Sequence, residues 1–137
     1  MEAQDYLKPT PDPSPDTAPF WNGLKEGKLL LQACAECGKV RHYPRPVCPH
    51  CYALEHRWVE AKGTGAVHSW TISHHAFHPG FKPELPYILV TVDLPEGVRM
   101  QAQLKGADAG ALRLGLPVKI GFEAATENLV LPVFVVA

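Results

Sequence analysis

Four cysteines, arranged as two closely spaced pairs, are the residues of this chain with the clearest chemistry. Cys34 and Cys37 form one Cys-x-x-Cys motif, and Cys48 and Cys51 form a second motif after a gap of ten residues. Each motif can present two thiolates from one tight turn, and together they supply the four donors that a tetrahedral divalent ion binds at about 2.3 Å. Gly38 permits the positive φ with which the chain can turn around the sulfurs. The spacing therefore predicts a metal site.

The identity of the metal and the role of the thiols have alternatives. Zinc is the expected ion, and iron in a rubredoxin-like four-thiolate site is the alternative. Two disulfides would suit a secreted chain, but residues 1–16 are acidic and rich in proline and do not resemble a secretory signal. A thioredoxin-like dithiol would need one pair in a βαβ setting, which the pattern lacks. Because protein thiolates fill all four positions, we expect a structural ion with no position open for substrate.

Composition limits the classes of function. The chain has 137 residues, a net charge of −1 and a hydrophobic fraction of 46%, which suits one compact domain or a small domain with an appended module. The near-neutral charge argues against broad nucleic-acid binding, which usually requires a strongly basic domain. No apolar run approaches the roughly 18 residues of a membrane span. We therefore expect a cytoplasmic protein with reduced thiols and no membrane contact.

The hydrophobic pattern predicts a mainly β fold in three parts. Residues 1–27 are expected to form an extended proline-rich arm, lying on a partner or disordered, followed by a short helix between Asp16 and Gly27. Residues 28–60 are expected to form a rubredoxin-like zinc ribbon, in which 41–47 leads back toward the second cysteine pair. Residues 61–137 are expected to form a five-stranded OB-fold barrel with strands near 66–77, 87–94, 98–104, 118–123 and 132–136, and with a loop or short helical turn at 107–115.

Large aromatic residues mark the short helix. Phe20, Trp21 and Leu24 give this helix one apolar face. The face can pack on the chain's own domain, or it can dock on a partner subunit, because two large aromatic side chains are costly to leave exposed. Phe20 and Trp21 are therefore candidate partner contacts.

The order of several short motifs resembles a family of acyl-CoA-associated OB-fold proteins with an N-terminal rubredoxin-like zinc ribbon, long catalogued as a domain of unknown function. The resemblance covers about residue 16 to the C-terminus. Tyr52 departs from the family pattern, in which a small residue often follows the second cysteine pair. The motifs that carry the resemblance are Phe20-Trp21, Cys34 to Gly38, Pro44-Arg45-Pro46, Cys48 to Cys51, Gly63-Thr64-Gly65, His78 to Phe81, Leu85-Pro86-Tyr87 and Gly115 to Val118.

The resemblance implies a subunit that works beside an acyl-CoA enzyme. Members of this family accompany thiolase-like proteins, steroid side-chain aldolases built on a thiolase fold, and hotdog-fold hydratases. A non-catalytic accessory subunit that binds or shields acyl-CoA and completes a thiolase-fold partner is therefore expected. The alternatives are a subunit of a hotdog-fold enoyl-CoA hydratase and, from another class, a ribbon and OB module that binds single-stranded nucleic acid. The residues agree with an accessory role, because every cysteine is assigned to metal and none is free as a nucleophile.

Two groups of residues are candidates for contact with acyl-CoA or with a partner. Histidine and aromatic residues lie at the end of the first expected barrel strand and in the loop that follows it, where a histidine could donate to a thioester oxygen or a phosphate. Alternatively they are solvated, with the two phenylalanines filling the mouth of the barrel. These residues are His74, His75, Phe77, His78 and Phe81. Arg41 and Arg45 belong to a basic cluster with Lys39 and Arg57 that could bind the phosphates of CoA, or form a solvated surface in which Arg45 supports the ribbon.

Overall fold

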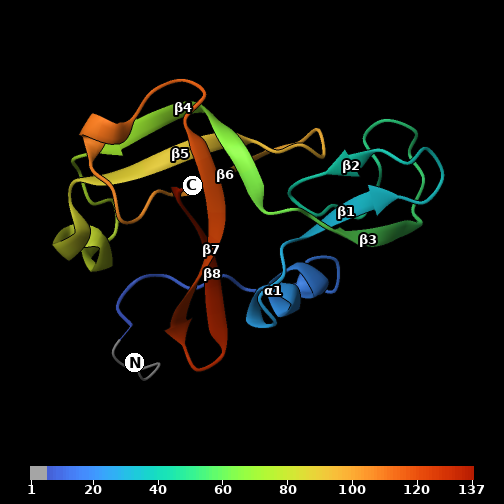
Figure 1. Ribbon diagram of the computed structural model, residues 1–137. Helices are drawn as coiled ribbons and strands as arrows, with labels where there is room; N and C mark the ends of the chain where they lie inside the picture. Colours follow the sequence, from blue (N-terminus) through green and yellow to red (C-terminus); the bar gives the residue numbers. More distant parts are fainter. Residues whose placement is uncertain (1–5) are drawn as a thin grey trace.

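The computed structural model describes residues 6–137 and contains two antiparallel sheets with a short helix beside them (Figure 1). The smaller sheet is the ribbon. It has the strand order β2-β1-β3 and is formed by β1 (Leu30–Cys34), β2 (Val40–Arg41) and β3 (His56–Glu60). Leu31 pairs with Val59 across the β1–β3 ladder. The ribbon is therefore held by one long and one very short strand pairing.

The larger sheet is the barrel. Its strand order is β6-β5-β4-β7-β8. A parallel bridge between Leu104, just after β6, and Phe134 on β8 brings the two edges of the sheet together. Five strands that close in this way are an OB-type barrel, as the sequence predicted. The strands are β4 (Thr64–Ser73), β5 (Tyr87–Asp93), β6 (Arg99–Gln103), β7 (Pro117–Thr126) and β8 (Leu129–Val136), and the 3₁₀ turns are η2 (Pro79–Glu84) and η3 (Ala109–Ala111).

One hydrophobic core runs from the barrel into the ribbon and the helix. The side chains of Val90 and Val92 on β5 are fully buried, and they alternate with partly buried side chains, as a strand with one face on a core requires. Leu31 on β1 and Leu24 on the helix belong to the same buried cluster. Burying each of these aliphatic side chains contributes about 1.5–3 kcal/mol relative to leaving it exposed. The ribbon and the barrel are therefore joined by shared apolar contacts.

The predicted helix is present as α1 (Ala18–Lys25), with proline in its first turn. The Thr17 side chain does not cap it; its hydroxyl instead accepts a hydrogen bond from the backbone N–H of Ser14 at 2.8 Å. Phe20 is only 2% exposed and packs in the shared core, so it is not a partner contact. Trp21 is half-buried and donates from Nε1 to the Tyr43 hydroxyl at 2.9 Å.

The proline-rich arm lies on the chain's own barrel. Lys8 forms an ion pair with Glu84 at 2.6 Å, and the backbone of Leu7 crosses Gly80 so closely that a Cβ there would meet it. Residues 6–8 therefore have a defined place on the chain's own barrel, which proline content alone did not predict. The first part of the predicted arm, residues 1–5, lies outside the described residues.

One expected strand is shorter than the sequence suggested, and the return toward the second cysteine pair is mostly irregular. The return toward the second cysteine pair is a strand only at Val40–Arg41, because Pro44 and Pro46 have no N–H to donate to a ladder. The long first strand of the barrel ends at Ser73 and not at Phe77. None of the helices in the described part of the chain is long and apolar enough to cross a membrane.

Candidate metal centre and adjoining cavities

The four cysteine sulfurs meet at one point between the turns of the ribbon. All four Sγ atoms lie within 4.8 Å of one another. The Sγ atoms of Cys34 and Cys51 are 3.5 Å apart, and those of Cys37 and Cys48 are 3.7 Å apart. A tetrahedral ion with bonds of about 2.3 Å requires sulfurs about 3.8 Å apart, whereas a disulfide requires about 2.05 Å. The geometry therefore fits a four-thiolate metal centre and excludes disulfides between these pairs.

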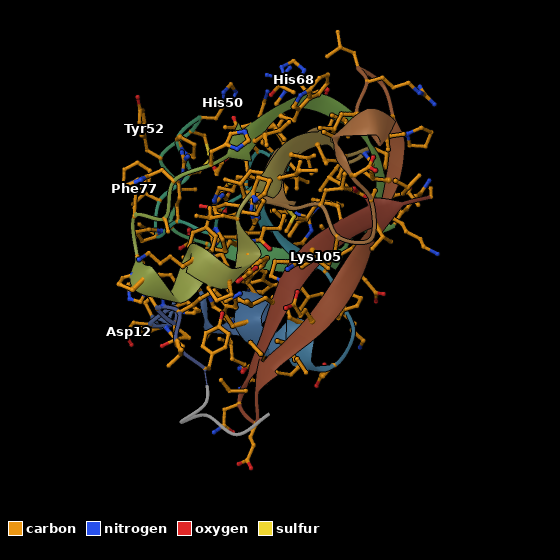
Figure 2. The ribbon with its side chains drawn as sticks, turned by 90° about the vertical axis from the view of Figure 1, so that its left-hand side faces the viewer. Asp12, His50, Tyr52, His68, Phe77 and Lys105 are labelled. Carbon is orange, nitrogen blue, oxygen red and sulfur yellow. The ribbon has the colours of Figure 1, made fainter. Side chains whose placement is uncertain are left out.

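The two cysteine turns have the same backbone design. In each turn, the residue four positions after the first cysteine returns its N–H to that cysteine's carbonyl: Gly38 to Cys34 at 3.0 Å, and Tyr52 to Cys48 at 2.9 Å. Both residues have positive φ, 78° for Gly38 and 66° for Tyr52. Tyr52 thus holds the position of a glycine. Its side chain is 77% exposed and points away from the molecule (Figure 2), so the departure from the family pattern leaves the turn intact.

Backbone donors prepare the first cysteine of each turn for metal. The N–H of Cys37 lies 3.4 Å from the sulfur of Cys34 and lowers the pKa of that thiol. The N–H of Cys51 is the main cause that lowers the pKa of Cys48 to about 6. The N–H of Ala53 also acts to lower the pKa of Cys51, but the other three sulfurs outweigh it and raise that pKa. Four thiolates this close together would repel one another without a cation, so this donor set suits a bound metal ion.

The metal centre is closed and structural. Cys34 and Cys48 are buried, and all four ligands come from this chain. No coordination position remains for a substrate or a catalytic water in a site of this kind. The centre fixes the two turns of the ribbon and does no chemistry itself.

The predicted histidine cluster lies in the loop after β4 and does not form one site. His75 stacks edge-on with Phe77 at a centroid distance of 4.7 Å, and Phe77 is 91% exposed. Figure 2 shows the Phe77 side chain at the periphery of the molecule. It does not fill the mouth of the barrel, which corrects one expectation. His74 is exposed as well, whereas His78 caps η2 by accepting from the N–H of Gly80 at 3.0 Å.

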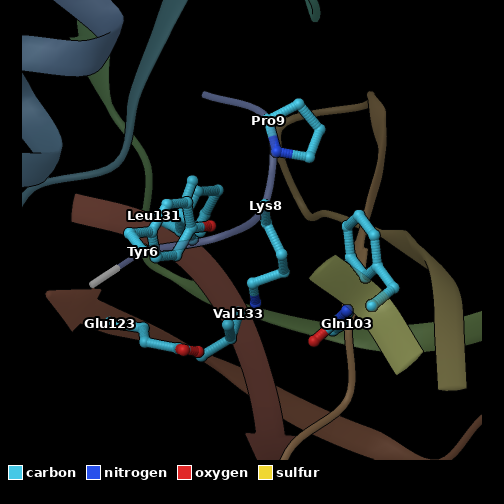
Figure 3. A pocket seen from close by; sticks show the side chains of 9 residues that line it. Tyr6, Lys8, Pro9, Gln103, Glu123, Leu131 and Val133 are labelled. Carbon is cyan, nitrogen blue, oxygen red and sulfur yellow. The ribbon is translucent and has the colours of Figure 1, made fainter. Parts of the chain in front are cut away.

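Phe81, the last member of the predicted cluster, faces an apolar pocket under the arm. The pocket has a volume of about 210 Å³. Tyr6, Lys8 and Pro9 of the arm line it together with Leu131 and Val133 of β8 (Figure 3). The Lys8 ammonium also lies 5.4 Å from the centre of the Phe81 ring. Sequence analysis missed this pocket because the arm and β8 are more than a hundred residues apart in the chain.

The basic residues of the ribbon are not an ordinary solvated patch. Arg41 is only 7% exposed, and its Nε donates to the Gln32 side-chain oxygen at 2.6 Å. Arg45 has an exposed side chain, but its backbone N–H donates to the same oxygen at 2.8 Å. The expected support of the ribbon by Arg45 thus comes from backbone atoms. The two arginines line one groove together with Arg99 of β6, which sequence analysis did not connect with them.

Both the ribbon and the barrel match models of known protein families. A family model described as "ChsH2, rubredoxin-like zinc ribbon domain" matches residues 21–57, and one described as "ChsH2, C-terminal OB-fold domain" matches residues 58–123. The chain belongs to the ChsH2-type DUF35 family. This confirms the resemblance inferred from the order of motifs, and it agrees with the ribbon and barrel that the structure contains.

The chain is similar to proteins with three different titles. A solved structure titled "Ltp2-ChsH2(DUF35) aldolase" superposes with a TM-score of 0.83 at 38% identity, over 93% of this chain and 98% of that chain. A "Probable enoyl-CoA hydratase alpha subunit" of Thermomonospora curvata is 40% identical over 93% of this chain, which spans 40% of that relative's length. The "Benzoylsuccinyl-CoA thiolase subunit BbsA" of Thauera aromatica is 28% identical over 85% of this chain and 72% of its own length.

Proposed function

We propose that this chain is a non-catalytic accessory subunit that binds or shields an acyl-CoA and completes the active site of a thiolase-like partner enzyme. The observation that carries the proposal is the match of ribbon and barrel together, with a TM-score of 0.83, to nearly the whole of one chain in a structure titled as an aldolase. The reaction of the partner is thiolytic or retro-aldol carbon–carbon cleavage of an acyl-CoA, in the breakdown of aromatic compounds or steroid side chains.

The chemistry of the chain supports a non-catalytic role. Thiolytic cleavage requires a cysteine nucleophile beside a base that deprotonates it. All four cysteines of this chain converge on the metal centre, so none of them is available as that nucleophile. The catalytic groups must then come from the partner.

We assign zinc to the metal centre. Cys34, Cys37, Cys48 and Cys51 would hold it, and its contribution is structural. A divalent zinc ion accepts tetrahedral thiolate ligands without redox chemistry, which suits a centre that only maintains the fold.

Two surfaces support contact with acyl-CoA and partner. The apolar pocket beneath the arm offers a surface for part of an acyl group, because Phe81, Leu131 and Val133 line it. Phe77 is an exposed aromatic side chain whose burial against a protein surface would be favourable. We assign the loop that holds His74, His75 and Phe77 to partner contact.

A hydratase subunit is the second candidate function. The Thermomonospora relative is named as the alpha subunit of a hydratase, and this observation favours the candidate. The chain matches only 40% of that relative, so the name belongs to a protein with a large part that has no counterpart in the match. Single-strand nucleic-acid binding is disfavoured by the net charge of −1.

Affinity purification of the tagged chain from native lysate under reducing conditions, followed by mass spectrometry and an acyl-CoA cleavage assay, tests the proposal. We expect a thiolase-fold protein in fixed ratio, whose activity is lost when this chain is removed. Phe77→Ala is expected to weaken the complex, whereas Leu114→Ala, at a residue that is 72% exposed elsewhere on the surface, is the matched control. Full activity of the partner alone would contradict the accessory role, and a hotdog-fold partner would favour the hydratase.

A further inference from the structure

A polar groove separates the ribbon from the hairpin that joins β5 to β6. In Figure 1 this hairpin extends from the barrel toward β2. The groove has a volume of about 680 Å³. The ribbon contributes Arg41, His42 and Arg45 to its walls, and the hairpin contributes Asp93, Val98 and Arg99. Two parts of the chain that are distant in sequence thus place three arginines around one space.

Arg41 is a buried charge without a carboxylate. Its side chain is fixed by two hydrogen bonds to neutral oxygens: Nε donates to Gln32 at 2.6 Å, and Nη2 donates to the carbonyl of Arg45 at 3.2 Å. Its Nη1 is buried and has no partner. Across residues 6–137, no acidic side chain forms an ion pair with this guanidinium. A buried charge is costly unless it is paired with an opposite charge. Arg41 therefore needs a counter-ion, and residues 6–137 do not supply one as an ion pair.

The other groups of the groove leave it positive. Asp93 is the acidic residue among those that line it, and its Oδ1 accepts from Arg99 Nε at 2.7 Å. Burial lowers the pKa of His42 to about 4, so that this ring is neutral near pH 7, and its Nδ1 also has no partner. Asp93 balances one arginine, and the charges of two arginines remain. An anion in the groove would meet the exposed side chain of Arg45 and the part of Arg41 that lines the groove.

We propose that this groove is an oxyanion site for the phosphate group of a nucleotide ligand. Two uncompensated guanidinium groups match a phosphate dianion better than the single charge of a carboxylate, and their planar forks can donate pairs of hydrogen bonds to its oxygens. The volume leaves room for more than the phosphate alone. The phosphate class follows from the charges of the groove. The identification of its carrier as CoA rests on the proposed function.

Calorimetric titration of the full, zinc-loaded chain with adenosine 3′,5′-bisphosphate tests the site. Adenosine serves as the comparison without phosphate, and inorganic phosphate serves as the competitor without nucleoside. Arg45→Gln and Arg99→Gln change exposed side chains, and the first keeps the backbone bonds of Arg45 to Gln32 and Arg41. Arg113→Gln removes an exposed arginine that does not line the groove, so it is the matched control for net charge.

We expect saturable binding of the bisphosphate, competition by inorganic phosphate and no binding of adenosine alone. Arg45→Gln should weaken binding by about tenfold or more, as the loss of a charge-assisted pair implies; Arg99→Gln should weaken it by leaving the charge of Asp93 unbalanced in the groove, and Arg113→Gln should not weaken it. Absence of saturable binding, equal binding of adenosine, or equal weakening by Arg113→Gln would overturn the proposal.

Bisphosphate binding and partner capture, both measured on the wild-type chain, separate this site from the proposed function. If the wild-type chain binds the bisphosphate but captures no thiolase-fold partner, the groove stands and the proposed function fails. If the partner is captured and bisphosphate binding is absent, the proposed function stands and the groove is not a phosphate site.

Discussion

The ribbon and the barrel are stabilised by different means. The ribbon consists of two five-residue strands and a strand of two residues, and its turns converge on four sulfurs. The barrel has five strands around side chains such as Val90, Val92 and Phe134, all fully buried. A small sheet buries too little apolar surface to define its loops, so metal bonds replace packing there. The comparison teaches that loss of metal and loss of core volume should damage different halves of one chain.

The largest effect should follow removal of a metal ligand. Cys48→Ser is expected to abolish stoichiometric metal binding and to disorder the turns of the ribbon, because apparent binding energies of structural zinc reach about 10–16 kcal/mol in small peptides. Metal analysis and amide NMR measure the two effects. Ala35→Ser, at an exposed position within the first turn, should change neither. If the ribbon stays ordered without metal, packing and not the ion determines its fold.

Truncation of the barrel core should come next. Phe134→Ala removes a fully buried ring on β8 and is expected to lower the free energy of unfolding by about 3–5 kcal/mol. Chemical denaturation measures this loss, and the metal content of the folded fraction should be unchanged. Phe122→Ala, at a residue that is 39% exposed on β7, should cost much less. Loss of metal in the Phe134 variant would show that the fold of the ribbon depends on the core of the barrel, against the separation of the two that we expect.

The arm offers a smaller test, confined to the barrel side. Gly80→Ala places a methyl group against the backbone of Leu7 and is expected to displace the arm at a cost of about 1–3 kcal/mol. Faster hydrogen exchange and proteolysis at residues 6–10, with unchanged metal content, would report the displacement. In Gly110→Ala the new Cβ meets only a side-chain oxygen of Asp108 at 3.1 Å, so the arm should stay in place.

The smallest effect concerns pH. Burial acts to raise the pKa of Glu84, but hydrogen bonds from Lys8 and Lys105 outweigh it and hold the pKa below its usual range. The carboxylate therefore stabilises the attachment of the arm above its ordinary pKa, and this contribution is lost as pH falls through the lowered value. The effect should be below about 1 kcal/mol, since the pair is partly exposed. The hydrogen-exchange protection of the Leu7 amide, measured as a function of pH, should show this loss. Glu84→Gln should remove the pH dependence, and Glu127→Gln should leave the pH dependence unchanged.

Features encoded by neighbours in sequence were predictable, and features made by distant segments were not. The metal centre follows from pairs of cysteines three residues apart, and the barrel strands follow from alternation, as at Val90 and Val92. The orphaned Nη1 of Arg41 has no signal in the sequence, because the groove forms only when the β5–β6 hairpin meets the ribbon. The proposed division at residue 60 stays a prediction, since buried residues on both sides of it belong to one core.

The sequence did not predict the position of the arm or the exposure of Phe77, for a related reason. Proline content shows that residues before the helix are not helical, but it does not show which surface they contact. The ion pair between Lys8 and Glu84 spans most of the chain and could not be inferred from either residue. For Phe77, hydrophobicity favours burial in general, yet the loop holds its ring outward.

The packing of α1 against β8 has a consequence for how the chain reaches its native state. The first helix of the chain and its last strand touch, and Phe20 and Phe134 belong to one buried cluster. Contacts between such distant segments raise the contact order, and proteins of high contact order fold slowly. During synthesis α1 emerges long before β8, so the apolar face of α1 is covered only once β8 has been made. We therefore expect the hydrophobic core to close only after β8 has been made, in one late and cooperative step.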